Sequence, residues 1–228
     1  MIRLVRTILG LIALCAASGA PARAEEQVDL LLVLASDVSR SVDTRKFELQ
    51  RQGYAAALSN APRHPALRLT VNAHASTLGR DHDFPDFVCA TADAHGIPRE
   101  SITVEIVEHA PPWDSYGFAT ALERLRLAGM RVALDDVGLG QSNFKMLLDA
   151  SPEFLKLDRY FVDGCANDPK RRAVISSIEE LARRFGARVI AEGVENEEDL
   201  MAVRTIGVSL VQGFLFSKPL SALELTVH

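Results

Sequence analysis

Cysteine and histidine are scarce in this chain, which has three Cys and six His among 228 residues. No Cys-x-x-Cys pair and no His/Cys cluster at metal-ligand spacing occurs, so neither a disulfide framework nor a structural zinc site is expected. Beyond the first 24 residues, no stretch reaches the ~18 consecutive apolar residues that a membrane-spanning helix needs, which excludes a multispanning protein.

Positive charge is also in deficit. The chain has 25 Lys plus Arg against 30 Asp plus Glu, a net charge of -5, whereas proteins that bind nucleic acids through phosphates usually carry the opposite sign. No DNA or RNA partner is therefore expected. The content of 48% hydrophobic and 24% charged residues is that of a globular protein, which excludes a disordered or collagen-like chain.

The opening segment has the pattern of a secretory signal peptide. Arg3 and Arg6 precede an uncharged apolar run over residues 8–17, and Ala22-Arg23-Ala24 is a small-x-small cleavage site. We therefore expect a signal peptide over residues 1–24 and a periplasmic or secreted mature chain without a transmembrane span. An uncleaved anchor or a wrongly assigned start is the alternative.

Strand and helix patterns alternate along the rest of the chain. Short apolar runs predict strands at residues 28–35, 67–71, 102–106, 132–134, 154–157, 188–191 and 208–211. Helical patterns lie between them at residues 44–58, 83–95, 118–128, 143–148, 171–185 and 196–205. This alternation predicts a parallel sheet covered by helices, either open and doubly wound or closed as a barrel.

Polar side chains occur where these strands end. They are Asn72, Glu105, Glu108, Asp135, Asp136, Lys156, Asp158, Glu192 and Gln212. In a barrel the carboxyl ends of all strands converge on one mouth, whereas an open sheet spreads them along a ridge. No G-x-G-x-x-G follows the first strand, which counts against a dinucleotide-binding sheet.

Carboxylate and amide oxygens gathered at one mouth favour Mg²⁺ or Mn²⁺ over zinc, because hard ions prefer oxygen ligands. Adjacent Asp135 and Asp136 could bind two ions, and Lys156 could orient a water or stabilise charge on a phosphate. The chemistry expected is metal-assisted hydrolysis of a phosphodiester. The structural alternative is that strand-end carboxylates cap helices or pair with Lys156 or Arg159, and that Gln212 satisfies loop backbone.

Six ordered segments resemble the EAL domain, the bacterial phosphodiesterase family that linearises cyclic di-GMP on a modified TIM barrel. They are Leu69-Thr70-Val71-Asn72, Val104-Glu105-Ile106-Val107-Glu108, Ala133-Leu134-Asp135-Asp136-Val137-Gly138-Leu139-Gly140, Leu155-Lys156-Leu157-Asp158-Arg159, Ile190-Ala191-Glu192-Gly193-Val194-Glu195 and Val211-Gln212-Gly213-Phe214-Leu215-Phe216-Ser217-Lys218-Pro219-Leu220. The resemblance implies that Asn72, Glu105 and Asp135 hold a first ion. It further implies that Asp136 holds the second ion and that Lys156 holds the catalytic water.

The same resemblance implies three further roles. Glu192 would assist with protons or lie just behind the metal ligands, and Gln212 would line the substrate site. Glu108 would brace the loop that follows the two aspartates. The implied cofactor is Mg²⁺ or Mn²⁺, the implied substrate is cyclic di-GMP, and a homodimer is a further expectation.

The chain departs from the family pattern at its N-terminal side. No E-A-L tripeptide occurs, although its glutamate names the family and binds metal in it. Residues 28–60 instead resemble the start of an exported von Willebrand factor A-type domain, with Asp37, Ser39 and Ser41 as a second metal-site candidate. A capped strand-to-helix turn is the alternative there.

These observations predict three regions: the signal peptide, a von Willebrand factor A-like strand-helix fragment with linker over residues 25–65, and an EAL-like domain over residues 66–228. The fold class expected is α/β, an incomplete TIM-type barrel whose seven predicted strands fall one short of the usual eight. Because the E-A-L glutamate is missing, phosphodiesterase activity is expected to be weak or absent.

Two alternatives to the enzyme remain open. The first is a non-catalytic EAL-like module that binds a nucleotide or a protein, and the second is an exported metal-binding protein of the adhesion type. The compartment depends on the same choice. A working signal peptide exports the chain, whereas an enzyme acting on cyclic di-GMP would need to be cytoplasmic.

Overall fold

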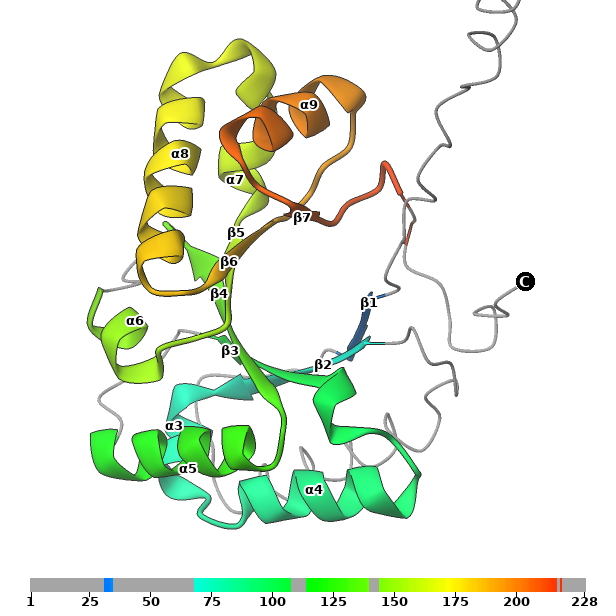
Figure 1. Cartoon of the computed structure of the whole chain (residues 1–228), viewed down its shortest axis with the longest axis vertical. Helices are drawn as coiled ribbons and strands as arrows, with labels where there is room; N and C mark the ends of the chain where they lie inside the picture. The colour runs from blue at the N-terminus through cyan, green and yellow to red at the C-terminus, as the bar shows by residue number, and fades with distance from the viewer. Residues whose placement is uncertain (1–30, 35–67, 108–113, 140–143, 217, 219–228) are drawn as a thin grey trace, which may run out of the picture.

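The computed structural model describes residues 31–34, 68–107, 114–139, 144–216 and 218. These residues have an α/β fold in which seven parallel strands follow one another across a single sheet in chain order. The strands are β1 Leu31–Leu34, β2 Arg68–His74, β3 Ile102–Val107, β4 Arg131–Val137, β5 Phe154–Leu157, β6 Arg188–Ala191 and β7 Leu210–Val211. The sheet curves, and the helices lie along its outer side (Figure 1).

The strands confirm the predicted alternation but differ at their ends. Strands β5 and β6 have the predicted bounds, whereas β2 runs three residues further, to His74. It does so because its pairing with β3 continues through Asn72↔Glu105 to His74↔Val107. Asn72 therefore lies within a strand, where the sequence pattern placed it after one.

Five predicted helices are present with ends shifted by a few residues. They are α4 Phe84–Ala94, α5 Ser115–Leu127, α6 Phe144–Ala150, α8 Pro169–Arg184 and α9 Glu197–Ile206. The sequence reading did not predict α3 Ala75–Arg80, α7 Arg159–Val162 or the short 3-10 turns η1 Arg99–Ser101 and η2 Cys165–Asn167. These elements are too short to show a helical repeat of apolar residues.

The core lies between the sheet and the covering helices. Strand β3 carries buried side chains on both faces, as expected for a parallel strand covered on both sides. Phe84 of α4 and Phe118 of α5 are the bulkiest fully buried side chains. Helices α3 and α5 meet at their backbones, because a Cβ on Gly117 would lie 2.5 Å from the carbonyl oxygen of Gly79.

Two exclusions drawn from composition can be checked in the described residues. Cys89 and Cys165 are both free thiols, and Cys165 is buried. No helix in the described part of the chain combines the length and the apolar character that crossing a membrane requires. The predicted signal peptide, the helix predicted at residues 44–58 and the predicted linker that ends at residue 65 lie outside the described residues.

Candidate functional site

Lys156 stands at the centre of a buried charge cluster. Its Nζ lies 2.8 Å from Glu105 Oε1, 2.9 Å from Asp135 Oδ1 and 2.7 Å from Glu192 Oε1. These three carboxylates come from β3, from β4 and from the residue that follows β6, so four neighbouring segments of the sheet meet at one ammonium group. Only 7% of the Lys156 side chain and 3% of the Glu105 side chain are exposed.

The cluster carries more negative than positive charge. Burial raises the pKa of Glu105 to about 8, even though Lys156 lies beside it, and burial also raises the pKa of Glu192. Burial alone would lower the pKa of Lys156, but Glu105, Glu192 and Asp135 outweigh it and raise that pKa. One ammonium faces one buried and two partly buried acidic side chains, so the site favours a further cation.

A bulge in β4 brings two adjacent aspartates to this cluster. Leu134 pairs with Leu155 and Val137 with Leu157, so β4 uses one more residue than β5 over the same span. Adjacent residues of a regular strand point to opposite faces, and a bulge re-aims them. Asp136 adopts a left-handed backbone with φ 51°, which costs a non-glycine residue about 1 kcal/mol.

The bulge allows three carboxylates to approach one another. Carboxylate oxygens of Asp135, Asp136 and Glu192 all lie within 4.8 Å of one another. Three carboxylate donors in partly buried positions, with excess negative charge around them, fit a hard divalent cation such as Mg²⁺ or Mn²⁺. The family resemblance implied that Glu192 assists with protons or lies just behind the metal ligands, whereas this geometry also allows it to bind the ion directly.

Gln212 extends the cluster toward β7. Its side-chain Nε2 donates a hydrogen bond to Glu192 Oε1, and its backbone N–H donates to Ala191 O at 2.9 Å. Within the described residues, no group donates to the buried Oε1 of Gln212. That oxygen is therefore available to accept a hydrogen bond from a bound molecule.

The structure places the other predicted site residues as follows. Asn72 is half-buried and lies opposite Glu105 in the register of β2 and β3, next to the cluster. Asp158 caps α7, accepting from the backbone N–H of Tyr160 at 2.6 Å, which agrees with the capping alternative for that residue. Glu108, Asp37, Ser39 and Ser41 lie outside the described residues.

Sequence reasoning missed the bulge, the left-handed backbone of Asp136 and the short helix α7. A signal for the two loops was present in Gly138 and Gly193, which follow Asp136 and Glu192 closely and adopt φ values of 98° and 67°. Glycine adopts these backbone angles without strain, so its position after each acidic residue indicates a tight turn at the site.

Comparisons with known proteins agree with this fold. The EAL domain family matches residues 23–219 of the chain, a range that includes the segment 28–60. The cyclic di-GMP phosphodiesterase RocR of Pseudomonas aeruginosa is 32% identical over 179 residues, which cover 78% of this chain and 45% of RocR. The chain thus spans less than half the length of that relative.

Solved structures give the same result. The EAL domain of Mycobacterium smegmatis DcpA superposes with a TM-score of 0.72 and 31% identity, covering 78% of this chain and 82% of that one. The Klebsiella pneumoniae BlrP1 complex with manganese and cyclic di-GMP superposes with a TM-score of 0.68 and 26% identity, covering 78% of this chain and 46% of BlrP1. Together with the family match over most of its length, these likenesses show that the chain belongs to the EAL domain family.

Proposed function

We propose that this chain is a divalent-cation-dependent phosphodiesterase that hydrolyses cyclic di-GMP to linear pGpG, at a rate reduced by the missing E-A-L glutamate. The observation that carries the proposal is the meeting of Lys156 with Asp135 and Glu192, with Asp136 close by. In this reaction a water oxygen joins phosphorus, the bond from phosphorus to one bridging 3′ oxygen breaks, and that oxygen takes up a proton.

The proposed ligands of the ion are Asp135, Asp136 and Glu192, with Glu105 and Asn72 beside them. The ion, when bound, would polarise a phosphoryl oxygen and lower the pKa of a bound water. The choice of Mg²⁺ or Mn²⁺ follows from the oxygen donor set, and structures of BlrP1 with cyclic di-GMP hold manganese or calcium. The metals in these BlrP1 structures support the proposal of a divalent cation for this chain.

Lys156 and Gln212 have proposed roles that do not require binding the ion, and Glu192 has a second role besides that of a ligand. Lys156 keeps its positive charge because three carboxylates surround it, so it can stabilise negative charge that develops on the phosphate. Glu192 contacts both Lys156 and Gln212 and is proposed to assist with protons at the site, where burial raises its pKa. Gln212 is proposed to bind the substrate through its free amide oxygen.

The test uses the purified chain, checked for folding by circular dichroism and incubated with cyclic di-GMP and Mn²⁺ or Mg²⁺. Chromatography should show pGpG that depends on the metal and disappears in Asp135→Asn. Asp149→Asn is the matched control, because Asp149 pairs with Lys145 on α6, apart from the cluster. A folded wild-type chain that yields no pGpG with either metal would contradict the enzymatic proposal.

A non-catalytic module is the second candidate. The absence of an E-A-L glutamate supports it, because loss of one carboxylate weakens a hard-cation site. Calorimetry would then show binding of cyclic di-GMP without product. The third candidate is an adhesion-type metal site at Asp37, Ser39 and Ser41. In that case Asp37→Ala should abolish metal binding, whereas Asp135→Asn should retain it.

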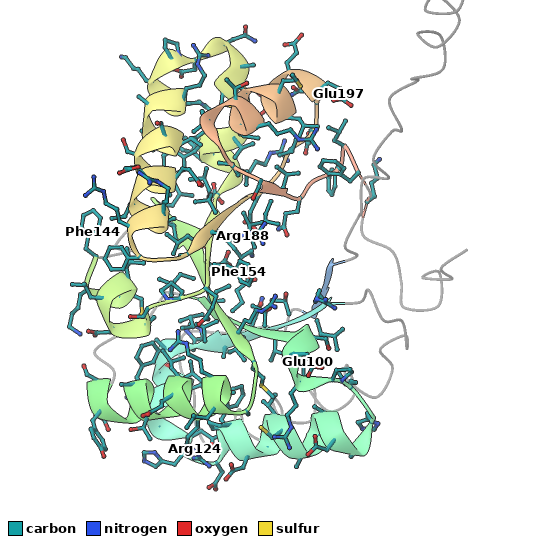
Figure 2. All side chains as sticks on the ribbon, in the orientation of Figure 1. Glu100, Arg124, Phe144, Phe154, Arg188 and Glu197 are labelled. Atoms are coloured by element: carbon teal, nitrogen blue, oxygen red, sulfur yellow. The ribbon has the colours of Figure 1, made fainter. Side chains whose placement is uncertain are left out.

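We also propose a homodimer formed through α6. Phe144 and Leu148 lie one turn apart on this helix and are 72% and 62% exposed, and Phe144 lies at the outer surface (Figure 2). Exposed apolar side chains at this spacing form a stripe that a second copy can cover. Phe144→Ser should convert a dimer to a monomer in sedimentation analysis, whereas the exposed control Met201→Ser on α9 should not.

We propose that the compartment of this protein depends on whether residues 1–24 act as a signal peptide. Export would place the mature chain in the periplasm or outside the cell, and retention would leave the enzyme in the cytoplasm. Mass analysis of the N-terminus, together with cell fractionation, distinguishes the two: export predicts a chain that begins at Glu25.

A further inference from the structure

The four-residue helix α7 lies between the two loops that carry the candidate metal ligands. It begins three residues after Lys156, directly beyond the end of β5. The bulge of β4 with Asp135 and Asp136 lies on one side, and the loop that begins at Glu192 lies on the other, since β4 and β6 are the two neighbours of β5. Contacts with α7 therefore reach both loops from a single helical turn.

Arg159 makes the contact with the Glu192 loop. A Cβ on Gly193 would lie 2.5 Å from Arg159 Cγ, so the aliphatic stem of Arg159 lies directly against the glycine backbone. The guanidinium group continues along the loop, and its Nη1 lies 2.7 Å from Glu195 Oε1. The other side of this loop is held by the residue that follows β7, since Val194 N–H donates to Gln212 O at 3.0 Å.

Phe161 makes the corresponding contact with the Asp136 loop. A Cβ on Gly138 would lie 2.8 Å from Phe161 Cε2, so the ring is packed against the loop backbone two residues after Asp136. The loop is closed by a hydrogen bond from Leu139 N–H to Asp136 O at 3.1 Å. Gly138 and Gly193 thus share two features, since each has a positive φ and neither has room for a Cβ.

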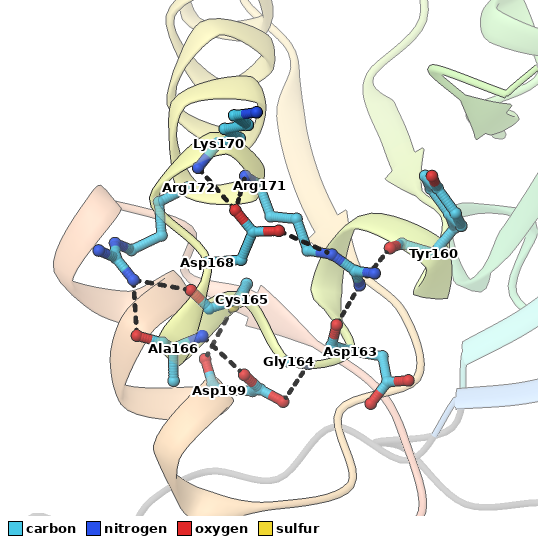
Figure 3. Close-up of polar contacts among 10 residues, drawn as sticks. All are labelled: Tyr160, Asp163, Gly164, Cys165, Ala166, Asp168, Lys170, Arg171, Arg172 and Asp199. Atoms are coloured by element: carbon cyan, nitrogen blue, oxygen red, sulfur yellow. Dashed lines mark hydrogen bonds and ion pairs between the residues drawn. The ribbon is translucent and has the colours of Figure 1, made fainter.

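Helix α7 is itself held from behind by α8. Arg171 Nη1 donates to Tyr160 O at 2.6 Å and also to Asp163 O, as Figure 3 shows. Asp168, which caps α8, lies 3.5 Å from Arg171 Nε. The carbonyl groups at both ends of α7 are therefore tied to a longer helix, which limits movement of Arg159 and Phe161.

We infer that α7 is a brace that sets the separation of the two carboxylate loops, with Arg159 and Phe161 as positioning residues for metal binding. The inference rests on the proposed metal site and extends it to residues outside the proposed set of metal ligands. Groups that orient metal ligands commonly change metal affinity by about 10–100-fold when they are replaced. The metal ligands that α7 would position are Asp136 on one side and Glu192 on the other.

The brace itself is tested without metal, by amide hydrogen exchange of the full chain. Arg159→Ala should speed exchange at the Val194 amide, and Phe161→Leu should speed exchange at the Leu139 amide, each by about tenfold. Arg184→Ala is the matched control. Arg184 forms an exposed ion pair with Glu180 on α8, and its removal should leave both amides unchanged.

Metal binding is tested in the same variants by calorimetric titration with Mn²⁺. Arg159→Ala and Phe161→Leu should weaken Mn²⁺ binding by about tenfold or more, while Arg184→Ala binds as the wild type does. Arg159→Lys, which keeps the stem and the charge, should recover most of the affinity, and Arg159→Met, which keeps only the stem, should recover less.

The outcomes separate this inference from the proposed function. Unchanged exchange at Val194 and Leu139 in the two variants overturns the brace, whatever the metal does. Faster exchange with wild-type Mn²⁺ affinity overturns its role in metal binding. A wild-type chain that binds no Mn²⁺ overturns the proposed metal site and the metal part of the inference, whereas tight Mn²⁺ binding without pGpG production leaves the brace supported and removes only the enzymatic proposal.

Discussion

Lys156 Nζ lies 2.7 Å from Glu192 Oε1, and the same carboxylate oxygen accepts a hydrogen bond from Gln212 Nε2. The three residues come from β5, from the turn after β6 and from the turn after β7. A single carboxylate oxygen thus joins three neighbouring strands at their carboxyl ends. Because a carboxylate oxygen of Glu192 also lies within 4.8 Å of one from Asp135 and one from Asp136, a change at any of these positions is expected to affect both stability and metal binding.

Replacement of Lys156 by methionine should strongly destabilise the metal-free chain. Lys156→Met keeps most of the side-chain volume but leaves Glu105, Asp135 and Glu192 without their buried cation, and breaking such a cluster costs about 3–5 kcal/mol. Urea denaturation measures the loss. Lys145→Met, which removes a 58%-exposed partner of Asp149, should cost far less, and equal losses would contradict the importance of the buried cluster.

The buried carboxyl of Glu105 should make the metal-free chain less stable as pH rises. Its pKa is raised from 4.5 to about 8 in the folded state, chiefly by burial. A raised folded-state pKa contributes stability that is complete below about pH 4.5 and is lost as pH rises through about 8. Urea denaturation without metal should therefore show a decline over this range that is reduced in Glu105→Gln. A Glu105→Gln variant with the same pH profile as the wild type would contradict this assignment.

The carboxylate of Asp199 should stabilise the chain in the opposite pH direction. It is buried, which alone would raise its pKa, but hydrogen bonds from the Ala166 and Gly164 amides, both at 2.9 Å, lower it (Figure 3). A lowered folded-state pKa contributes stability that is present above the unfolded value of 3.8 and is lost as pH falls. Asp199→Asn should lower the free energy of unfolding by about 1–3 kcal/mol near neutral pH. The further loss of stability toward acid pH should then be smaller in this variant than in the wild type.

Asp163→Asn is the control for this prediction. The Asp163 side chain is exposed, and its backbone carbonyl accepts a hydrogen bond from Arg171 nearby. This variant should unfold at nearly the wild-type urea concentration. If Asp163→Asn and Asp199→Asn lose the same stability, the buried hydrogen bonds of Asp199 are not the cause.

The left-handed backbone of Asp136 predicts a difference between two substitutions that both remove the carboxylate. Asp136→Gly should leave the metal-free chain about 1 kcal/mol more stable than Asp136→Ala, because only glycine adopts φ 51° without strain. Both variants should bind Mn²⁺ more weakly than the wild type. Thermal unfolding and calorimetric titration measure the two effects, and equal stability of the two variants would show that this backbone is not strained.

The amino-acid sequence by itself was enough to predict the alternation of strands and helices, the bounds of β5 and β6, and the group of polar residues near the strand ends. These features depend on local patterns: apolar runs for buried strands, apolar repeats for helices, and motif residues at defined spacings. The family resemblance found from Asp135-Asp136 and from Glu192 to Glu195 is confirmed by the family match over residues 23–219.

The tertiary structure decided how those residues meet. The bulge in β4 depends on the pairing of Leu134 and Val137 with β5, which no local pattern contains. The raised pKa of Glu105 depends on burial, and the contacts of Arg159 and Phe161 depend on two glycines that lie far from them in sequence. Local preferences can place a carboxylate at the end of a strand, but only packing between distant segments sets its distance from a second carboxylate and the charge that it carries.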